Sequence, residues 1–79
     1  MSTVTVRYFA VLRERKGVSD ERVEVSPGTT LGELYRSLFP SPTGEWLPVA
    51  CAKNHEYASA DELVEDGDDI AFLPPLGGG

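Results

Sequence analysis

Hydrophobic and polar residues alternate over the first segment of the chain, residues 3–9. A period of two, rich in β-branched residues, is typical of a strand that buries one face. The core side of this predicted strand comprises Val4, Val6 and Tyr8. Residues 10–16 then change to good helix formers and end at Gly17, which can adopt the left-handed conformation that stops a helix.

A second alternating segment lies at residues 22–25, where Val23 and Val25 share one face. The polar residues 19–21 before it predict a turn. Together with the first strand, this segment is expected to form a hairpin-like pair whose connection contains one or two turns of helix.

The main helix is indicated by residues 30–40. Thr30 and Glu33 have the spacing of a capping box, in which both side chains accept hydrogen bonds from backbone N–H groups at the start of a helix. Pro40 cannot continue the helix, because it lacks an N–H group and its ring clashes with the preceding turn. The apolar stripe of this amphipathic helix comprises Leu31, Leu34 and Leu38.

The second half of the chain shows shorter patterns. Residues 41–44 are typical of a loop, residues 47–53 of a modest strand, and residues 54–56 of a turn. Residues 59–63 predict a short capped turn. An additional short edge strand is left open in this part of the chain.

The last predicted strand covers residues 69–73, after a turn at 66–68, with Ile70 and Phe72 on one face. One long helix is available to cover one face of a single mixed sheet of four to five strands. This arrangement belongs to the α+β class. We expect the domain to span residues 1–73 and residues 74–79 to form a protruding tail.

Length and composition restrict the class of protein. Seventy-nine residues suffice for one small domain. The longest apolar stretch is only a few residues, whereas a membrane-spanning helix needs about 20, and no signal-peptide core follows Met1. We therefore expect a soluble protein of the cytoplasm.

Charge narrows the candidate partners. Thirteen acidic and seven basic residues give a net charge of −6, which is the wrong sign for binding nucleic acid or an anionic membrane. Basic protein partners suit this charge better. The acidic residues between positions 62 and 69 lack the spacing of an EF-hand, and we interpret them as a solvated face that can steer such a partner.

Three single residues of reactive or aromatic type are interpreted as structural. Cys51 has no second cysteine to pair with and no evident catalytic partner, so it is expected to be a buried thiol. His55 is expected to lie in a solvated turn, and no metal site is predicted. Trp46 is expected to plug the edge of the core under the loop at 42–48, with an interface role left open.

The last six residues differ in composition from the rest of the chain. Two consecutive prolines remove two amide donors and hold the backbone near polyproline II, so the last strand cannot continue. Glycines without Cβ atoms allow the tail to enter a slot too narrow for side chains, and six residues can extend about 20 Å. We interpret the tail as functional. It comprises Pro74, Pro75, Leu76, Gly77, Gly78 and Gly79.

Two segments and the glycine end together resemble the small subunit of molybdopterin synthase. They are YFAVLRE at residues 8–14 and LVEDGDDIAFLPP at residues 63–75, and the most specific part is the DGD…F-x-P-P-x-x-G-G ending. The resemblance extends over essentially the whole chain. It implies a ubiquitin-like β-grasp fold and a sulfur carrier that donates sulfur for the dithiolene of molybdopterin.

The same resemblance assigns roles within the tail. Gly79 is the carrier residue, Gly78 its required neighbour and Leu76 the apolar anchor, whereas Gly77 departs from the family pattern, which usually has a side chain there. The Gly79 carboxylate is ionised and unreactive at pH 7, so it must become an acyl-adenylate before sulfur displaces AMP and leaves a thiocarboxylate. The chain has no G-x-x-x-x-G-K-[ST] loop for ATP phosphates. ATP is therefore expected to be consumed by a partner, and this chain to bind no cofactor.

Two protein partners are implied by the resemblance. One is an adenylating enzyme related to ubiquitin activators. The other is the large subunit of the synthase, which holds the catalytic residues and forms a heterotetramer with the small subunit. This chain is not expected to be an enzyme, because no pair of its side chains offers a nucleophile with its base.

Other functions of the same activated tail stay open. Carriers for thiamine, tRNA thiolation or cysteine synthesis, and a ubiquitin-like protein modifier, would share the activation step and differ only in the acceptor. The two prolines and the total length favour molybdopterin.

The pleat of the predicted strands indicates a surface for such partners. If Tyr8 faces the helix, Phe9 must face away, and Leu73 likewise lies opposite Phe72. The first and last strands of a β-grasp sheet run side by side. Phe9 and Leu73 are therefore expected to share an exposed apolar patch beside the tail, and such patches are typical of partner interfaces.

Overall fold

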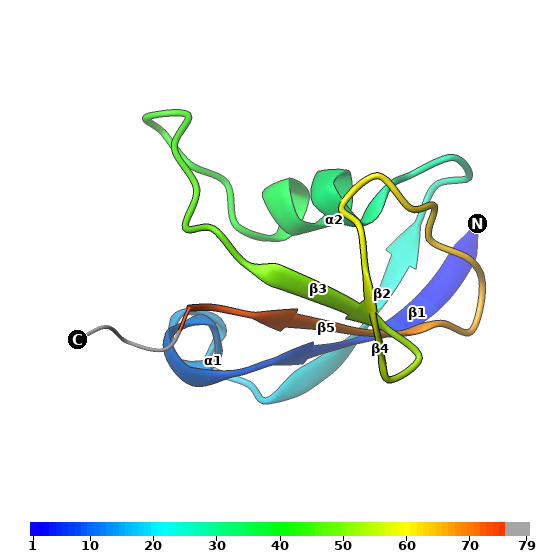
Figure 1. Cartoon of the computed structure of the whole chain (residues 1–79), viewed down its shortest axis with the longest axis horizontal. Coiled ribbons are helices and arrows are strands. Elements are labelled where there is room, and N and C mark those ends of the chain that lie inside the picture. Colours follow the sequence, from blue (N-terminus) through cyan, green and yellow to red (C-terminus); the bar gives the residue numbers. More distant parts are fainter. Residues whose placement is uncertain (76–79) are drawn as a thin grey trace.

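The order of elements in the computed structural model, which describes residues 1–75, follows the sequence prediction closely (Figure 1). None of the helices within these residues is both long enough and apolar enough to cross a lipid bilayer. The elements are β1 (Ser2–Tyr8), α1 (Ala10–Lys16), β2 (Asp20–Val25), α2 (Leu31–Leu38), β3 (Ala50–Lys53), β4 (Glu56–Ala58) and β5 (Asp69–Leu73).

The five strands form one mixed sheet in the order β2-β1-β5-β3-β4. β1 runs parallel to β5, and the other neighbouring pairs are antiparallel. The first and last strands are therefore adjacent, as predicted. Figure 1 shows α2 across one side of the sheet, which confirms the expected α+β class with one main helix on one face.

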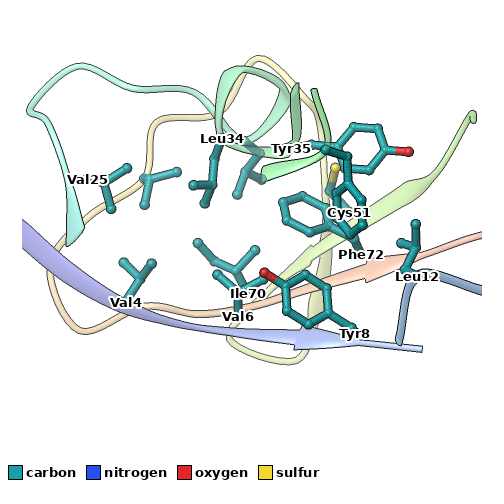
Figure 2. Close-up of a cluster of buried hydrophobic side chains, with 13 residues drawn as sticks. Val4, Val6, Tyr8, Leu12, Val25, Leu34, Tyr35, Cys51, Ile70 and Phe72 are labelled. Carbon is teal, nitrogen blue, oxygen red and sulfur yellow. The ribbon is translucent and has the colours of Figure 1, made fainter. Parts of the chain in front are cut away.

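The core lies between α2 and the sheet, and side chains from both layers point toward one another (Figure 2). Val4, Val6 and Tyr8 are at most 1% exposed, and Ile70 and Phe72 are fully buried, so both predicted strand faces are confirmed. Complete burial of one large apolar side chain stabilises a fold by about 1.5–3 kcal/mol. The rest of the buried cluster comprises Leu12, Val25, Leu31, Leu34, Tyr35, Phe39, Cys51 and Val64.

The predicted capping box at the start of α2 is present. The Glu33 N–H donates to Thr30 Oγ1 (3.2 Å), and the Thr30 N–H donates to Glu33 Oε1 (2.9 Å). The predicted stripe is confirmed as well, because Leu31 and Leu34 are buried and Leu38 packs partly buried against the core. The capping box therefore fixes where the helix begins, and with it which face meets the sheet.

We expect Thr30→Ala to lower the free energy of unfolding by about 1 kcal/mol. The Glu33 N–H loses its acceptor, and the Glu33 carboxylate loses the hydroxyl that helps to hold it at the Thr30 N–H. Urea denaturation of the wild-type and variant proteins measures this loss. Thr30→Ser is the matched control, since it keeps the hydroxyl, and it should retain most of the stability. An equal loss in both variants would assign the effect to the Thr30 methyl group instead.

The prediction of a strand over residues 47–53 is wrong in its first half. β3 begins only at Ala50, and Pro48 lacks the N–H group that a sheet ladder requires. The Leu47 carbonyl accepts a hydrogen bond from the Tyr35 hydroxyl (2.7 Å). This stretch is therefore tied to α2 and not to the sheet.

The predicted turn at residues 19–21 is also shorter than expected. Asp20 and Glu21 belong to β2 and pair with residues of β1. The Tyr8 hydroxyl donates to Glu21 Oε2 (2.6 Å), and burial together with this carboxylate raises the pKa of Tyr8. The Tyr8 N–H also donates to the Ser19 carbonyl (2.8 Å), and this backbone bond extends the pairing of the hairpin by one residue before β2.

The short edge strand that the sequence left open is β4. The turn before it consists of Asn54 and His55, which adopt the left-handed conformation with φ of 53° and 72°. Glu56 already begins the strand, so the predicted turn at 54–56 is one residue too long.

The interpretation of the acidic segment as a solvated face is wrong for Asp68. This residue is 7% exposed and accepts hydrogen bonds from Asn54 Nδ2 (3.0 Å) and the Glu65 N–H (2.8 Å). Asp66 accepts a hydrogen bond from the Thr3 N–H (2.8 Å). These two carboxylates hold the turn that leads into β5.

Trp46, which was predicted to plug the edge of the core, is 36% exposed. Its Nε1 donates to the Phe39 carbonyl (2.6 Å), which ties the loop after α2 to the end of that helix. The indole is therefore anchored at the end of α2, and its role in closing the core stays a prediction.

Candidate functional site

A shallow hollow lies on the face of the sheet opposite α2. Ala52 and Ala71 are paired across β3 and β5, and their small side chains form its floor. Larger side chains surround them, because Arg7 pairs with Ala71 on one side and Tyr57 with Ala52 on the other. The hollow is lined by Arg7, Phe9, Ala52, His55, Tyr57, Asp69, Ala71 and Leu73.

Phe9 and Leu73 both line this hollow, as the pleat argument predicted. Phe9 is 42% exposed and sits immediately before α1 with an extended backbone (φ −129°, ψ 151°). Leu73 is the last residue of β5 and is half-buried. Their expected orientation away from α2 is confirmed, and their role in binding a partner stays a prediction.

Tyr57 is the functional candidate that sequence reasoning missed. It lies on the edge strand β4 and is 83% exposed, the most exposed aromatic side chain in the described part of the chain. Large exposed aromatic side chains are common energetic anchors of protein interfaces. The sequence contained one signal for it. If the short edge strand had been assigned to residues 56–58, the alternation of side chains along a strand would have indicated which face Tyr57 occupies.

A bidentate ion pair closes one end of the hollow. Arg7 Nε donates to Asp69 Oδ1 (2.9 Å) and Arg7 Nη2 donates to Asp69 Oδ2 (3.0 Å). The two residues come from the adjacent strands β1 and β5. The hydrogen bonds from Arg7 lower the pKa of the Asp69 carboxyl group and raise the pKa of the guanidinium.

The lowered pKa of Asp69 predicts a pH dependence of stability. The folded state favours the ionised carboxylate, so its contribution is complete above the unfolded pKa of about 3.9. It is lost as the pH falls through the lower folded pKa. We expect the difference in unfolding free energy between wild type and Asp69→Asn to shrink over this acid range.

Urea denaturation at a series of pH values from neutral to acid measures this difference. Glu14→Gln is the control, because Glu14 is exposed on α1 and its carboxylate makes no hydrogen bond or ion pair in the part of the chain that the structure describes. A difference that stays constant for Asp69→Asn across the acid range would contradict the assigned pKa shift.

A second hollow continues the first toward the tail. The two share Tyr57 and Leu73, so one surface runs from Phe9 to the two prolines. Residues 76–79, which include the predicted carrier Gly79, lie outside the described residues. The second hollow is lined by Pro48, Val49, Ala50, Tyr57, Leu73, Pro74 and Pro75.

The remaining candidate side chains have structural explanations. Cys51 is buried in the core, which confirms the prediction of a buried thiol, and this burial raises the pKa of the thiol. His55 is exposed in its turn, as expected, and also contributes to the wall of the first hollow.

Sequence comparison relates the whole chain to known carriers. The model of the ThiS family matches residues 6–79. A molybdopterin synthase sulfur carrier subunit from Mycobacterium tuberculosis is 35% identical over 83 residues, which cover 100% of both chains. A protein of the same name from Chlamydomonas reinhardtii is 33% identical over 81 residues, which cover 96% of this chain and 98% of the relative. The resemblance noted in the sequence is thereby confirmed.

Solved structures agree with the fold. SAMP1 from Haloferax volcanii, a small archaeal modifier protein, superposes with a TM-score of 0.79 at 27% identity over 99% of this chain and 100% of that chain. Subunits 1 and 2 of the molybdopterin-converting factor from Helicobacter pylori form a protein–protein complex, and a chain of it matches with a TM-score of 0.62 at 30% identity, covering 98% and 99%. A ubiquitin from Caldiarchaeum subterraneum matches with a TM-score of 0.63 at 19% identity, covering 99% and 98%, which confirms the ubiquitin-like β-grasp fold.

Proposed function

This chain belongs to the ThiS family, and we propose that it is a sulfur carrier for molybdopterin synthase in molybdenum cofactor biosynthesis. The observation that carries this proposal is the 35% identity to the Mycobacterium tuberculosis carrier subunit, which extends over the full length of both chains. A match of this extent includes both the folded domain and the tail. It therefore favours a shared use of the tail as well as a shared fold.

The proposed chemistry takes place at the carboxylate of Gly79. A carboxylate oxygen attacks the α-phosphorus of ATP, and pyrophosphate leaves to give an acyl-adenylate. A sulfur nucleophile at the oxidation level of sulfide then attacks the acyl carbon, and AMP leaves with the carbon–oxygen bond electrons. The product is a thiocarboxylate, in which one oxygen has been replaced by one sulfur. ATP is bound and consumed by the activating partner, which is an adenylating enzyme related to ubiquitin activators.

The described part of the chain supports this role by offering a surface beside the tail. Phe9, Tyr57 and Leu73 surround a floor of small residues on the outer face of the sheet, and the surface continues to Pro75. A partner that binds this surface would hold Pro74 and Pro75, the first residues of the tail, at a defined distance from its own active site. The Helicobacter pylori complex of subunits 1 and 2 supports a second synthase subunit as one such partner. We further propose that this partner is the large subunit, that it holds the catalytic residues, and that the two subunits form a heterotetramer in the cytoplasm.

Protein modification is the second candidate, and the likeness to SAMP1 from Haloferax volcanii favours it. Both functions require the same acyl-adenylate at Gly79. They diverge at the next step, where an amine in place of sulfur attacks the acyl carbon and forms an amide with another protein.

A reconstituted synthase tests the proposal. The chain is incubated with an adenylating enzyme, ATP and sulfide, and then with a large synthase subunit and the pterin precursor. Formation of the dithiolene product only when this chain is present supports the carrier function. Absence of product, together with covalent attachment of the chain to lysines of other proteins, would favour the modifier.

A further inference from the structure

Strand β2 forms one edge of the sheet, and its outer side is unpaired among residues 1–75. The backbone of β1 shows which groups of β2 point outward. The Thr5 N–H donates to the Asp68 carbonyl (3.0 Å), and the Thr3 carbonyl accepts from the Gly67 N–H (2.9 Å). Thr5 and Thr3 therefore direct their backbone groups away from β2, toward the β5 side of the sheet.

The partners of these two threonines on β2 are Arg22 and Glu24. In an antiparallel pair, positions that exchange hydrogen bonds alternate with positions that do not. Arg22 and Glu24 occupy the positions that do not, so their N–H and C=O groups point to the outer edge. An open row of donors and acceptors of this kind is a template for one more strand.

A groove accompanies this edge on the side that faces α2. Val23 from β2 is the one apolar lining residue that is more than 5% exposed, because Val25 and Leu34, which also line the groove, belong to the buried core. Glu24 and Glu33 line it as well. The groove shares no lining residue with the two hollows on the opposite face. A partner at this edge would therefore leave the tail-side surface free.

The charges along the edge favour a basic occupant. Asp20, Arg22 and Glu24 lie on the face of β2 that is turned away from α2. Two of these three side chains are acidic. Glu33 stands at the start of α2, where hydrogen bonds from Thr30 lower the pKa of its carboxyl group. The net charge of −6 adds a long-range attraction for a cationic segment.

We propose that an extended, basic segment of a partner protein adds as a further strand to the outer edge of β2 and places an apolar side chain in the groove between β2 and α2. Main-chain hydrogen bonds to Arg22 and Glu24 would supply affinity. Because successive residues of a strand face opposite sides, apolar residues of the segment would enter the groove while the basic residues between them meet Asp20 and Glu24. This interaction goes beyond the carrier function and does not depend on it.

A synthetic peptide provides the probe. The acetylated and amidated peptide KVKVKVK should slow hydrogen exchange at the Arg22 and Glu24 amides by about tenfold or more at saturation, as read by NMR. The acidic counterpart EVEVEVE should leave both amides unchanged. Two further peptides carry N-methyl groups, one on all lysines and the other on all valines, so that each lacks every second backbone N–H donor. Only every second residue of an added strand donates to β2, so one of these two peptides should no longer slow exchange at Arg22 and Glu24.

Arg22→Pro is the matching protein variant. It removes an outward N–H group and leaves the hydrogen bonds between β1 and β2 in place, as proline allows at a strand edge. The association constant for KVKVKVK should fall about tenfold or more, whereas Arg22→Ala should keep it. The N-methylated peptides keep the test decisive if Arg22→Pro does not fold.

Three results would overturn the proposal. The first is unchanged exchange at Arg22 and Glu24 with saturating peptide. The second is equal binding of the acidic peptide. The third is slow exchange of these amides in the absence of peptide, with a protection that increases with protein concentration. That result would mean that a second copy of this chain pairs with the β2 edge.

Discussion

Deleting Gly79, or appending one residue after it, is expected to abolish sulfur transfer while leaving the stability of the fold almost unchanged. Every residue of the described core lies at or before Phe72, so the change should not affect unfolding. The acyl carbon, in contrast, must arrive at a fixed depth in two partner sites. One residue displaces it by about 3.3 Å, and a misplacement of about 1 Å can already cost a hundredfold in rate.

The reconstituted synthase gives the rate of product formation, and urea denaturation gives the unfolding midpoint. Gly77→Ala is the matched control within the tail, because the resemblance to the carrier subunits implies that a side chain is accepted at this position, and this variant should retain transfer. Full activity after the deletion or the extension would contradict the assignment of Gly79 as the carrier residue.

Phe9→Ala and Leu73→Ala are expected to weaken binding to the large synthase subunit or to the activating enzyme far more than they weaken folding. Both side chains line the hollow opposite α2, so truncation removes little from the buried core. At the centre of an interface, loss of a large apolar anchor commonly costs about 2 kcal/mol or more, which corresponds to roughly a thirtyfold weaker complex.

Calorimetry measures the dissociation constants, and denaturant unfolding measures the stability of the same variants. Val18→Ala is the control, since Val18 is 43% exposed, close to the 42% of Phe9, and does not line either hollow. Tyr57→Ala should behave like Phe9→Ala. Unchanged affinity combined with a marked loss of stability would show that Phe9 and Leu73 act in folding and not in binding.

The fold could be predicted where one local pattern determines the structure. The alternation around Val4 and Val6 sets which face of β1 is buried, because a shift by one residue would expose the whole apolar set. The capping box at Thr30 and the proline at position 40 bracket α2 in the same local way. The outward orientation of Phe9 followed from the same pleat.

The features that sequence reasoning missed depend on contacts between distant residues. Arg7 and Asp69 are separated by 62 positions, and only the parallel pairing of β1 with β5 brings them together. Asp68 is buried because Asn54 on another turn supplies a donor. Strand β4 has only three residues, and its pairing with β3 places Tyr57 beside Ala52 at the hollow.

The mass of the C-terminal peptide shows whether the Gly79 carboxylate becomes a thiocarboxylate. The chain is incubated with an adenylating enzyme, ATP and a sulfide source, digested, and analysed by mass spectrometry. We expect a peptide ending in Gly79 that is heavier by the difference between one sulfur and one oxygen atom, and only when ATP and sulfide are both present. A C-terminal peptide that keeps its carboxylate mass, or that appears only as an amide joined to lysines of other proteins, would contradict the carrier function.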